Sequence, residues 1–170
     1  MKRYASIRKM DISNGEGIGI SLFVQGCHFH CKNCFNPETW DFKGGKEWNQ
    51  EVRKHFIELA NNEHIHRISI LGGEPLCDEN IEEIINLCKE LKEKYPNKKI
   101  WIYSGYTYEQ IQQDINKAEI LDIADILVDG PYEENKQDFN LYFRGSSNQR
   151  IIELANKKVR TYENDRKETS

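Results

Sequence analysis

The segment from Cys27 to Cys34 constrains this chain more than any other, because it places the thiols of Cys27, Cys31 and Cys34 within eight residues. A structural zinc site fills all four tetrahedral positions with protein ligands. A cubane 4Fe–4S cluster also has four corners, which are usually bound by four Cys thiolates. No fourth cysteine lies beside these three. The segment therefore indicates an iron–sulfur cluster with one iron left open to a small molecule.

A zinc knuckle is the alternative use of the same thiols, with His28, His30 or Cys77 as the fourth ligand. Zinc motifs usually consist of two ligand pairs about 12 to 20 residues apart. Three thiols on one short loop fit that pattern poorly, so the cluster is favoured. Cys88 is expected to pack as a small hydrophobic residue, because it falls on the apolar face of a predicted helix.

The composition is that of one domain with a modest core. The chain has 170 residues, of which 38% are hydrophobic, and no apolar run is long enough to span a membrane. The first residues include basic side chains but no apolar stretch or cleavage site after them, so no secretory signal is expected. We therefore predict a single domain over residues 1–170, located in the cytoplasm.

Cysteine content and net charge narrow the possible partners. Five cysteines, three of them clustered, fit metal binding in a reducing compartment better than a disulfide framework. The formal net charge of −4 argues against a general nucleic-acid-binding surface. The chain is therefore expected to bind neither nucleic acid nor membrane.

Two kinds of hydrophobic periodicity alternate along the chain. Strands are predicted over 18–24, 66–71, 99–103, 126–128 and 150–154. Helices are predicted over 48–61, from an N-cap at Asp78 to Leu91, and after a cap at Thr107, where Ile111 and Ile115 would face inward. Strands that alternate with helices predict right-handed βαβ units and an α/β fold with a mainly parallel sheet.

Each motif that carries polar or glycine residues comes directly after one of these strands. Cys27 follows the first strand, Gly72 the second and Ser104 the third. In parallel α/β folds the site is built from the loops at the carboxyl ends of the strands, so these motifs are expected to meet. A complete eight-stranded barrel needs about 250 residues, and this chain is too short to close one.

The spacing Cys-x3-Cys-x2-Cys resembles the cluster motif of radical S-adenosylmethionine enzymes, and the residues that follow it, 35–40, sharpen the likeness. A cysteine motif followed by aromatic-Asn-x-x-Thr-Trp is similar to that of the activating proteins of anaerobic ribonucleoside-triphosphate reductase, a family of glycyl-radical activases. Segments 72–76, 103–106, 128–132 and 143–150 agree with that family in order. Asn33 departs from the superfamily pattern, in which many members carry an aromatic residue before the third cysteine.

The resemblance implies an open partial (βα) barrel with a mainly parallel sheet, built as one radical S-adenosylmethionine domain. It implies that Cys27, Cys31 and Cys34 bind three irons of the cluster and that S-adenosylmethionine chelates the fourth. Reductive cleavage of this cofactor would give a 5′-deoxyadenosyl radical, which removes hydrogen from one glycine in the large subunit of the reductase. The implied partners are that subunit and reduced flavodoxin or a similar electron donor.

The resemblance also implies a set of contact residues. Glycine lets the backbone approach a ligand closely, so Gly72 and Gly73 would present carbonyls to the methionine ammonium group, while Glu74 adds attraction or braces the turn. The implied cofactor-binding residues are Asn33, Cys34, Phe35, Gly72, Gly73, Glu74, Ser104 and Gly105. Contacts with the partner or the cofactor are implied for Asn36, Trp40, Asp129 and Arg144. An ordinary strand-to-helix turn at 72–75 and a turn aspartate at Asp129 remain the alternatives.

Two other functions stay open at the level of sequence. A small radical enzyme that acts on a deazapurine-type precursor would need a closed polar pocket, whereas an activase needs an open face for a protein loop. A zinc-binding interaction module would be colourless, so metal analysis and colour under anaerobic conditions separate it from a cluster protein.

Overall fold

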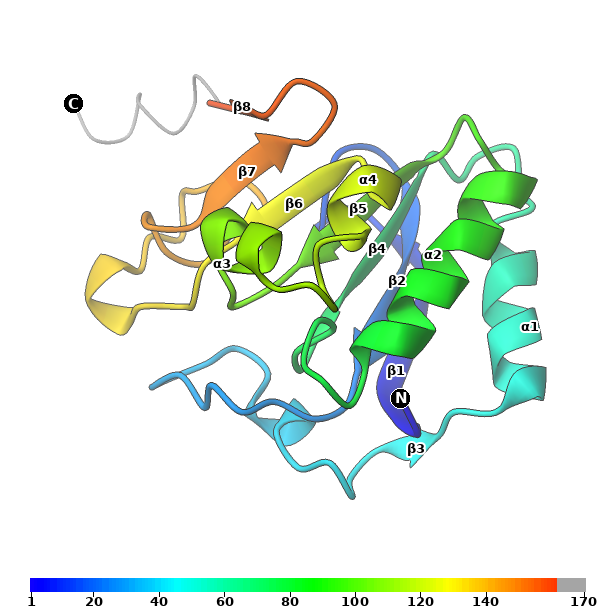
Figure 1. Ribbon diagram of the computed structural model, residues 1–170, viewed down its shortest axis with the longest axis horizontal. Coiled ribbons are helices and arrows are strands. Elements are labelled where there is room, and N and C mark those ends of the chain that lie inside the picture. The colour runs from blue at the N-terminus through cyan, green and yellow to red at the C-terminus, as the bar shows by residue number, and fades with distance from the viewer. Residues whose placement is uncertain (162–170) are drawn as a thin grey trace.

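A computed structural model describes residues 1–161, in which eight strands form one sheet (Figure 1). The strands are β1 (Arg3–Asp11), β2 (Gly19–Val24), β3 (Lys46–Glu47), β4 (Arg67–Gly72), β5 (Lys99–Tyr103), β6 (Ile126–Asp129), β7 (Arg150–Glu153) and β8 (Lys158–Val159). The helices of the same residues are α1 (Gln50–Leu59), α2 (Ile81–Lys94), α3 (Tyr108–Gln113) and α4 (Ile120–Ile123), with short 3-10 helices η1 (Pro37–Thr39) and η2 (Glu134–Lys136). The end of the predicted domain, 162–170, lies outside the described residues.

The sheet is mixed and open, which corrects the prediction of a mainly parallel sheet. Its strand order is β3-β1-β2-β4-β5-β6-β7-β8. The central strands β2, β4, β5 and β6 make three parallel pairings, and the outer strands add four antiparallel ones. β1 joins β2 through the short connection 12–18, and the connection from β6 to β7 contains no crossover α-helix. Both chain reversals therefore give antiparallel neighbours.

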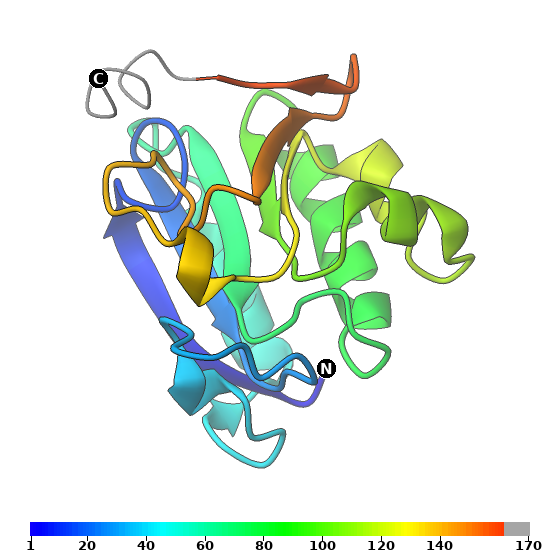
Figure 2. The ribbon, with the colours of Figure 1, turned by 90° about the vertical axis from the view of Figure 1, so that its left-hand side faces the viewer.

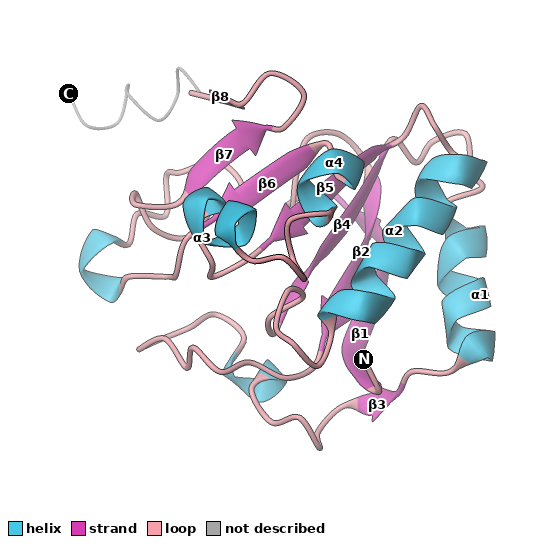
Figure 3. Ribbon diagram, viewed as in Figure 1, coloured by secondary structure: helices cyan, strands magenta, loops and turns pink. Residues whose placement is uncertain are grey.

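Helices α1 to α4 lie on one face of the sheet (Figures 1 and 3). Successive side chains of a strand point to opposite faces, so every second residue of the central strands contacts these helices. The core between the two layers includes Ile20, Leu22 and Val24 of β2 with Ile68 and Ile70 of β4, all at most 1% exposed. Burial of these branched side chains holds the helices against this face of the sheet.

The opposite face of the sheet carries a smaller apolar cluster of Trp101, Ile126, Val128 and Ile151. The segment 130–149 lies over this face, away from the helices (Figure 2). Its Phe143 packs edge-on against Trp101, with 5.5 Å between the ring centroids. This contact holds the long connection against the middle of β5.

Most predicted elements are confirmed, with three differences at helix ends and sheet edges. Thr107 caps α3 through a capping box, as predicted. The prediction of Asp78 as the cap of α2 is wrong, because Asn80 holds that position and Asp78 pairs with Lys117 at 2.6 Å. Ile115 is 92% exposed because α3 ends at Gln113. The edge strands β3 and β8, the neighbouring strand β1 and the short helix α4 are not predicted from the sequence.

Within residues 1–161 no helix is long and apolar enough to cross a membrane.

Candidate functional site

On the face of the sheet opposite the helices, the last side chain of each parallel strand lines a cavity of about 370 Å³. These residues are Phe23 of β2, Leu71 of β4, Tyr103 of β5 and Val128 of β6. Phe23 is in register with Leu71, and Tyr103 with Val128, so the four form a row across the sheet. The cavity therefore lies at the carboxyl ends of the parallel strands, where the sequence predicts that the motifs meet.

The loops that follow these strands form the walls of the cavity. The predicted site residues that line it are Cys27, Cys31, Cys34, Phe35, Asn36, Trp40, Gly72, Gly73, Glu74, Ser104, Gly105 and Arg144. They come from segments far apart in the sequence, and the fold brings them together. The structure thus assembles most of the predicted residues around a single space.

Backbone hydrogen bonds hold the cysteine loop at the end of β2. Gly26 N–H donates to the carbonyl of Thr39 at 2.6 Å, and Cys27 N–H donates to the carbonyl of Trp40 at 3.1 Å. His30 has a φ of 47° and stacks on Trp40 with 4.7 Å between ring centroids. The residues at the end of η1 therefore hold the cysteine loop through two backbone hydrogen bonds and one ring contact.

A tight turn brings the second and third cysteines near each other. Cys34 N–H donates to the carbonyl of Cys31 at 3.1 Å, and Asn33 between them has a φ of 54° in the left-handed region. Asn36 N–H donates to the Sγ atom of Cys34 at 3.4 Å. Asparagine tolerates a left-handed backbone better than most residues, which explains its presence in this turn.

The thiols have the chemistry of a soft-metal donor set. Burial raises the pKa of the Cys27 and Cys31 thiols above the ordinary value of 9.0, so a bound cation is needed to stabilise their thiolates. The possible fourth zinc ligands, His28, His30 and Cys77, are not among the lining residues. Three thiols on one cavity, with no fourth Cys and no His among the described lining residues, fit an iron–sulfur cluster better than structural zinc.

The thiols share the cavity without forming a closed metal site. Among residues 1–161, no group of three or more His, Cys, Asp or Glu side chains is close enough to hold a metal ion. Cys88 of α2 is fully buried in the hydrophobic core, as predicted, and burial raises the pKa of its thiol to about 12. Cys77 is also fully buried, with a pKa of about 12 for the same reason.

Glu74 joins the turn after β4 to the turn after β5. Its side chain is 2% exposed, and its carboxylate accepts hydrogen bonds from the hydroxyl of Ser104 at 2.8 Å and the N–H of Gly105 at 2.6 Å. The N–H of Leu76 donates to the same carboxylate at 2.9 Å. Burial raises the pKa of Glu74 to about 7, although these donors oppose the shift. A buried carboxylate therefore braces two walls of the cavity.

The glycines at 72–73 permit close packing of backbone on backbone. Gly72 has a φ of 106°, a conformation that side chains rarely adopt. A Cβ atom at Gly73 would lie 2.4 Å from the carbonyl oxygen of Gly26 and 2.9 Å from that of Thr39. The Gly26 carbonyl also accepts a hydrogen bond from the N–H of Glu74 at 2.7 Å. The glycine turn thus abuts the start of the cysteine loop directly.

Two predicted contact residues lie outside the cavity lining. The amide of Asn33 donates a hydrogen bond to a carboxylate oxygen of Glu134, which turns the side chain toward η2. Asp129 is 1% exposed and accepts hydrogen bonds from the N–H of Tyr108 at 2.7 Å and the Nε of Arg150 at 3.1 Å. The structure therefore uses both side chains to hold neighbouring segments.

Other lining residues are not found by the sequence reasoning. They include Arg8, Ser13, Asn14, Phe29 and Leu141, whereas Tyr132, Phe143 and Gln149 lie in the segments 128–132 and 143–150 that the resemblance singles out without a role for each residue. The first three lie on or just after β1, which shows no clear apolar alternation. Leu141 and Phe143 belong to the long segment 130–149, which has no periodicity. Phe29 could have been noticed as an aromatic residue between two cluster cysteines.

The comparison with known proteins agrees with this donor set. A family model described as a 4Fe-4S single cluster domain matches residues 13–152, which contain the cysteine loop and all the loops of the cavity. This match gives the class of the chain as a 4Fe-4S single cluster domain protein.

Similar curated proteins carry one name, anaerobic ribonucleoside-triphosphate reductase-activating protein. The protein of Enterobacteria phage T4 is 36% identical over 148 residues, which cover 87% of this chain and 92% of that protein. Those of Pasteurella multocida (strain Pm70) and Escherichia coli (strain K12) are each 33% identical and cover 89% of this chain and 98% of their own lengths. The chain therefore belongs to the family of anaerobic ribonucleoside-triphosphate reductase-activating proteins.

Proposed function

We propose that this chain activates an anaerobic ribonucleoside-triphosphate reductase by generating a glycyl radical on its large subunit. The observation that carries the proposal is the convergence of three thiols, Cys27, Cys31 and Cys34, on one cavity at the carboxyl ends of the parallel strands. Family membership agrees with it, because the similar curated proteins are named for this activation. When bound, the cluster supplies an electron that cleaves S-adenosylmethionine to methionine and a 5′-deoxyadenosyl radical, which takes hydrogen from the glycine.

The residues of the chain bind and orient the reactants. Cys27, Cys31 and Cys34 would hold three irons and leave the fourth for the amino and carboxylate groups of the cofactor. The backbone of 72–74 and Ser104, just after β5, face the same cavity and would receive the rest of the cofactor. Phe35, Asn36, Trp40 and Arg144 also line this space and are candidates for contact with the cofactor or the glycine loop. We assign no such contact to Asn33 or Asp129, whose side chains hold other segments.

The size of the cavity supports a protein substrate. Small-molecule sites occupy about 300 to 1,000 Å³, and this cavity of about 370 Å³ lies near the lower limit. A nucleoside cofactor would fill most of it. The hydrogen donor then has to reach the cofactor from outside, as a loop of another protein can. A closed pocket for a second small molecule, required by a deazapurine-type reaction, has little room.

The arrangement of the sheet supports the open partial barrel and the single domain. Arg160, just after β8, forms an ion pair of 2.5 Å with Glu16 in the connection before β2. Residues near the two sides of the sheet are thus linked at the ends opposite the cysteine loop. The curved sheet would then hold the cofactor on its inner face while the rim stays accessible to the reductase.

The cellular setting follows from the chemistry. A glycyl radical is destroyed by oxygen, so the protein is proposed to act in an anaerobic cytoplasm. Reduction of the cluster requires a low-potential donor, for which reduced flavodoxin or a similar protein is suitable. The net charge of −4 is more compatible with a protein partner than with nucleic acid.

Anaerobic reconstitution with iron and sulfide, followed by electron paramagnetic resonance with and without S-adenosylmethionine, tests the proposal. The spectrum of the reduced cluster should change on addition of the cofactor. Mixing with the cognate reductase should then give a glycyl doublet on the reductase, and exposure to air should cleave that chain at the radical glycine. Cofactor cleavage without a protein radical, together with turnover of a deazapurine precursor, would reject the activase assignment and retain the radical chemistry.

A further inference from the structure

Phe29, between the first and second cysteines, rests on the backbone of Gly105 in the turn after β5. A Cβ atom at Gly105 would lie 2.8 Å from both Cδ2 and Cε2 of the Phe29 ring. The φ angle of Gly105 is outside the left-handed region, so backbone geometry does not require glycine here. What an added methyl group would meet is the aromatic ring of the cysteine loop.

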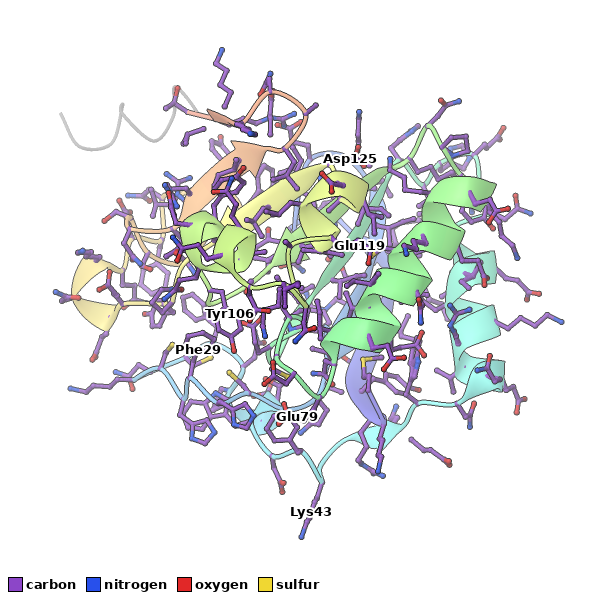
Figure 4. The ribbon with its side chains drawn as sticks, in the orientation of Figure 1. Phe29, Lys43, Glu79, Tyr106, Glu119 and Asp125 are labelled. Atoms are coloured by element: carbon purple, nitrogen blue, oxygen red, sulfur yellow. The ribbon has the colours of Figure 1, made fainter. Side chains whose placement is uncertain are left out.

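The ring of Phe29 also packs edge-on against Tyr106, with 4.9 Å between centroids and 73° between planes. Figure 4 shows the two side chains close together, one from the cysteine loop and the other from the turn after β5. Edge-to-face packing of this kind is one of the two favoured geometries of aromatic pairs. The cysteine loop therefore has a directional contact with the turn after β5, at a residue 77 positions further along the chain.

The surface under Phe29 is held from two sides. Glu74 accepts a hydrogen bond from the N–H of Gly105 at 2.6 Å. Lys117 is 3% exposed, lies 5.2 Å from the centroid of the Tyr106 ring, and pairs with Asp78 at 2.6 Å. A contact with such a fixed surface limits where the turn between the first two cysteines can lie.

The other contacts of this turn point elsewhere. His28 pairs with the exposed carboxylate of Glu79 (labelled in Figure 4) at 2.8 Å. His30 stacks on Trp40. Neither contact reaches β5. Among the described residues, Phe29 thus provides the aromatic link from the cysteine turn to the strand end that forms the opposite wall.

We infer that Phe29 is a positioning residue, which docks the turn between Cys27 and Cys31 onto Gly105 and Tyr106, and that Gly105 is glycine to make room for the Phe29 ring. This inference rests on the proposed function, because it is as cluster ligands that the two cysteines need a fixed separation. It gives Gly105 a role different from direct contact with the cofactor. The two roles are experimentally separable, since one depends on Phe29 and the other does not.

The test compares the full chain with Gly105→Ala, Phe29→Ala and the double variant. In the metal-free protein, the alkylation rates of Cys27 and Cys31 under anaerobic conditions report the placement of the turn by mass spectrometry. Gly105→Ala should raise these rates by roughly tenfold when Phe29 is present, a coupling within the range for residues in contact. In the Phe29→Ala background the same substitution should have no further effect. Phe29→Leu replaces Phe29→Ala if the latter folds poorly.

Reconstituted proteins supply a second readout. Gly105→Ala should lower iron retention and alter the spectrum of the reduced cluster, and these effects should vanish in the Phe29→Ala background. Gly73→Ala is the matched control, because its Cβ meets the Gly26 carbonyl and its effects should persist without Phe29.

Three outcomes would overturn the inference. The first is a Gly105→Ala protein that behaves as the wild type. The second is an equal effect of Gly105→Ala on alkylation with and without Phe29. The third is loss of S-adenosylmethionine binding by Gly105→Ala in the Phe29→Ala background, which would return Gly105 to the cofactor site. Failure of the wild-type protein to take up iron, with the alkylation pattern as expected, would instead reject the proposed function.

Discussion

The backbone N–H of Gly105 donates a hydrogen bond of 2.6 Å to the Oε1 atom of Glu74, across the ends of two neighbouring parallel strands. The second oxygen, Oε2, accepts from the hydroxyl of Ser104 at 2.8 Å. Both strand ends line the cavity, so the carboxylate couples two of its walls. Its burial has a consequence for the pH dependence of stability.

Glu74 should make the free energy of unfolding fall as the pH rises from about 5 to about 7. Burial raises the pKa of this carboxyl from 4.5 to about 7, so the folded protein holds a proton that the unfolded chain has released over this range. Stability is highest below the unfolded pKa and declines through the folded one, by about 3 kcal/mol at most. Denaturant titrations of the metal-free protein at several pH values measure the slope.

Two variants isolate this carboxyl. Glu74→Gln removes the titrating group, so the decline between pH 5 and 7 should disappear, with a loss of about 1 to 3 kcal/mol at pH 5 from unsatisfied hydrogen bonds. Ser104→Ala removes a donor to the ionised form and should move the midpoint of the decline to higher pH. An unchanged slope in the Glu74→Gln protein contradicts the assignment.

Replacement of Cys27, Cys31 or Cys34 by Ala should abolish the cluster and the reductive cleavage of S-adenosylmethionine. Each thiol lines the cavity, and the described lining residues include no further cysteine that could replace a lost ligand. Cys88→Ala is the control, since this residue lies in the helix-side core and should affect stability alone. Iron content and methionine release, measured anaerobically, separate the two classes. A Cys31→Ala protein with four irons and full cleavage would show that the ligand assignment is wrong.

Asp129→Asn should lower stability and leave cofactor affinity unchanged. The buried carboxylate accepts hydrogen bonds from the N–H of Tyr108 and from Arg150, whose side chain is 36% exposed. Loss of the charge should cost about 1 to 3 kcal/mol, since Arg150 keeps solvent and Glu109 as partners. Thermal unfolding and the dissociation constant of S-adenosylmethionine are the measurements. Weaker cofactor binding without lower stability would place Asp129 back in the site.

The sequence predicts the location of the site better than the shape of the sheet. Cys27, Gly72 and Ser104 each follow an apolar run, and parallel pairing brings such strand ends to one edge. The direction of β7 is not readable in this way, because the connection 130–149 lacks the periodicity that would reveal whether it crosses the sheet. β1 escapes prediction because its charged and apolar residues do not alternate clearly between two faces.

Side-chain direction within the site is also beyond the reach of sequence patterns. The resemblance predicts that Asn33 contacts the cofactor. In the structure Asn33 lies in a left-handed turn, and its amide points toward the carboxylate of Glu134, 101 residues further along the chain. Gly73 is recognised as a glycine that allows close approach, yet the approaching group is the Gly26 carbonyl. Long-range packing decides both cases, and a motif carries no information on it.

Gly73→Ala should therefore impair the cluster as well as cofactor binding, whereas the motif alone predicts an effect on the cofactor. The new Cβ would lie 2.4 Å from the carbonyl oxygen of Gly26, which precedes Cys27 and accepts a hydrogen bond from Glu74. Because the clash is with backbone, the cysteine loop has to shift, with a cost of about 1 to 3 kcal/mol. Iron retention after anaerobic gel filtration should fall together with the melting temperature.

Gly17→Ala separates displacement of the loop from general loss of stability. Gly17 has a φ of 73° and no atom within 4 Å of an added Cβ, so alanine there introduces backbone strain without a clash. This variant should melt at a lower temperature and still retain its iron, because it leaves the contact between Gly73 and Gly26 intact. Full iron retention in Gly73→Ala, or equal iron loss in both variants, would show that this backbone contact does not position the cysteine loop.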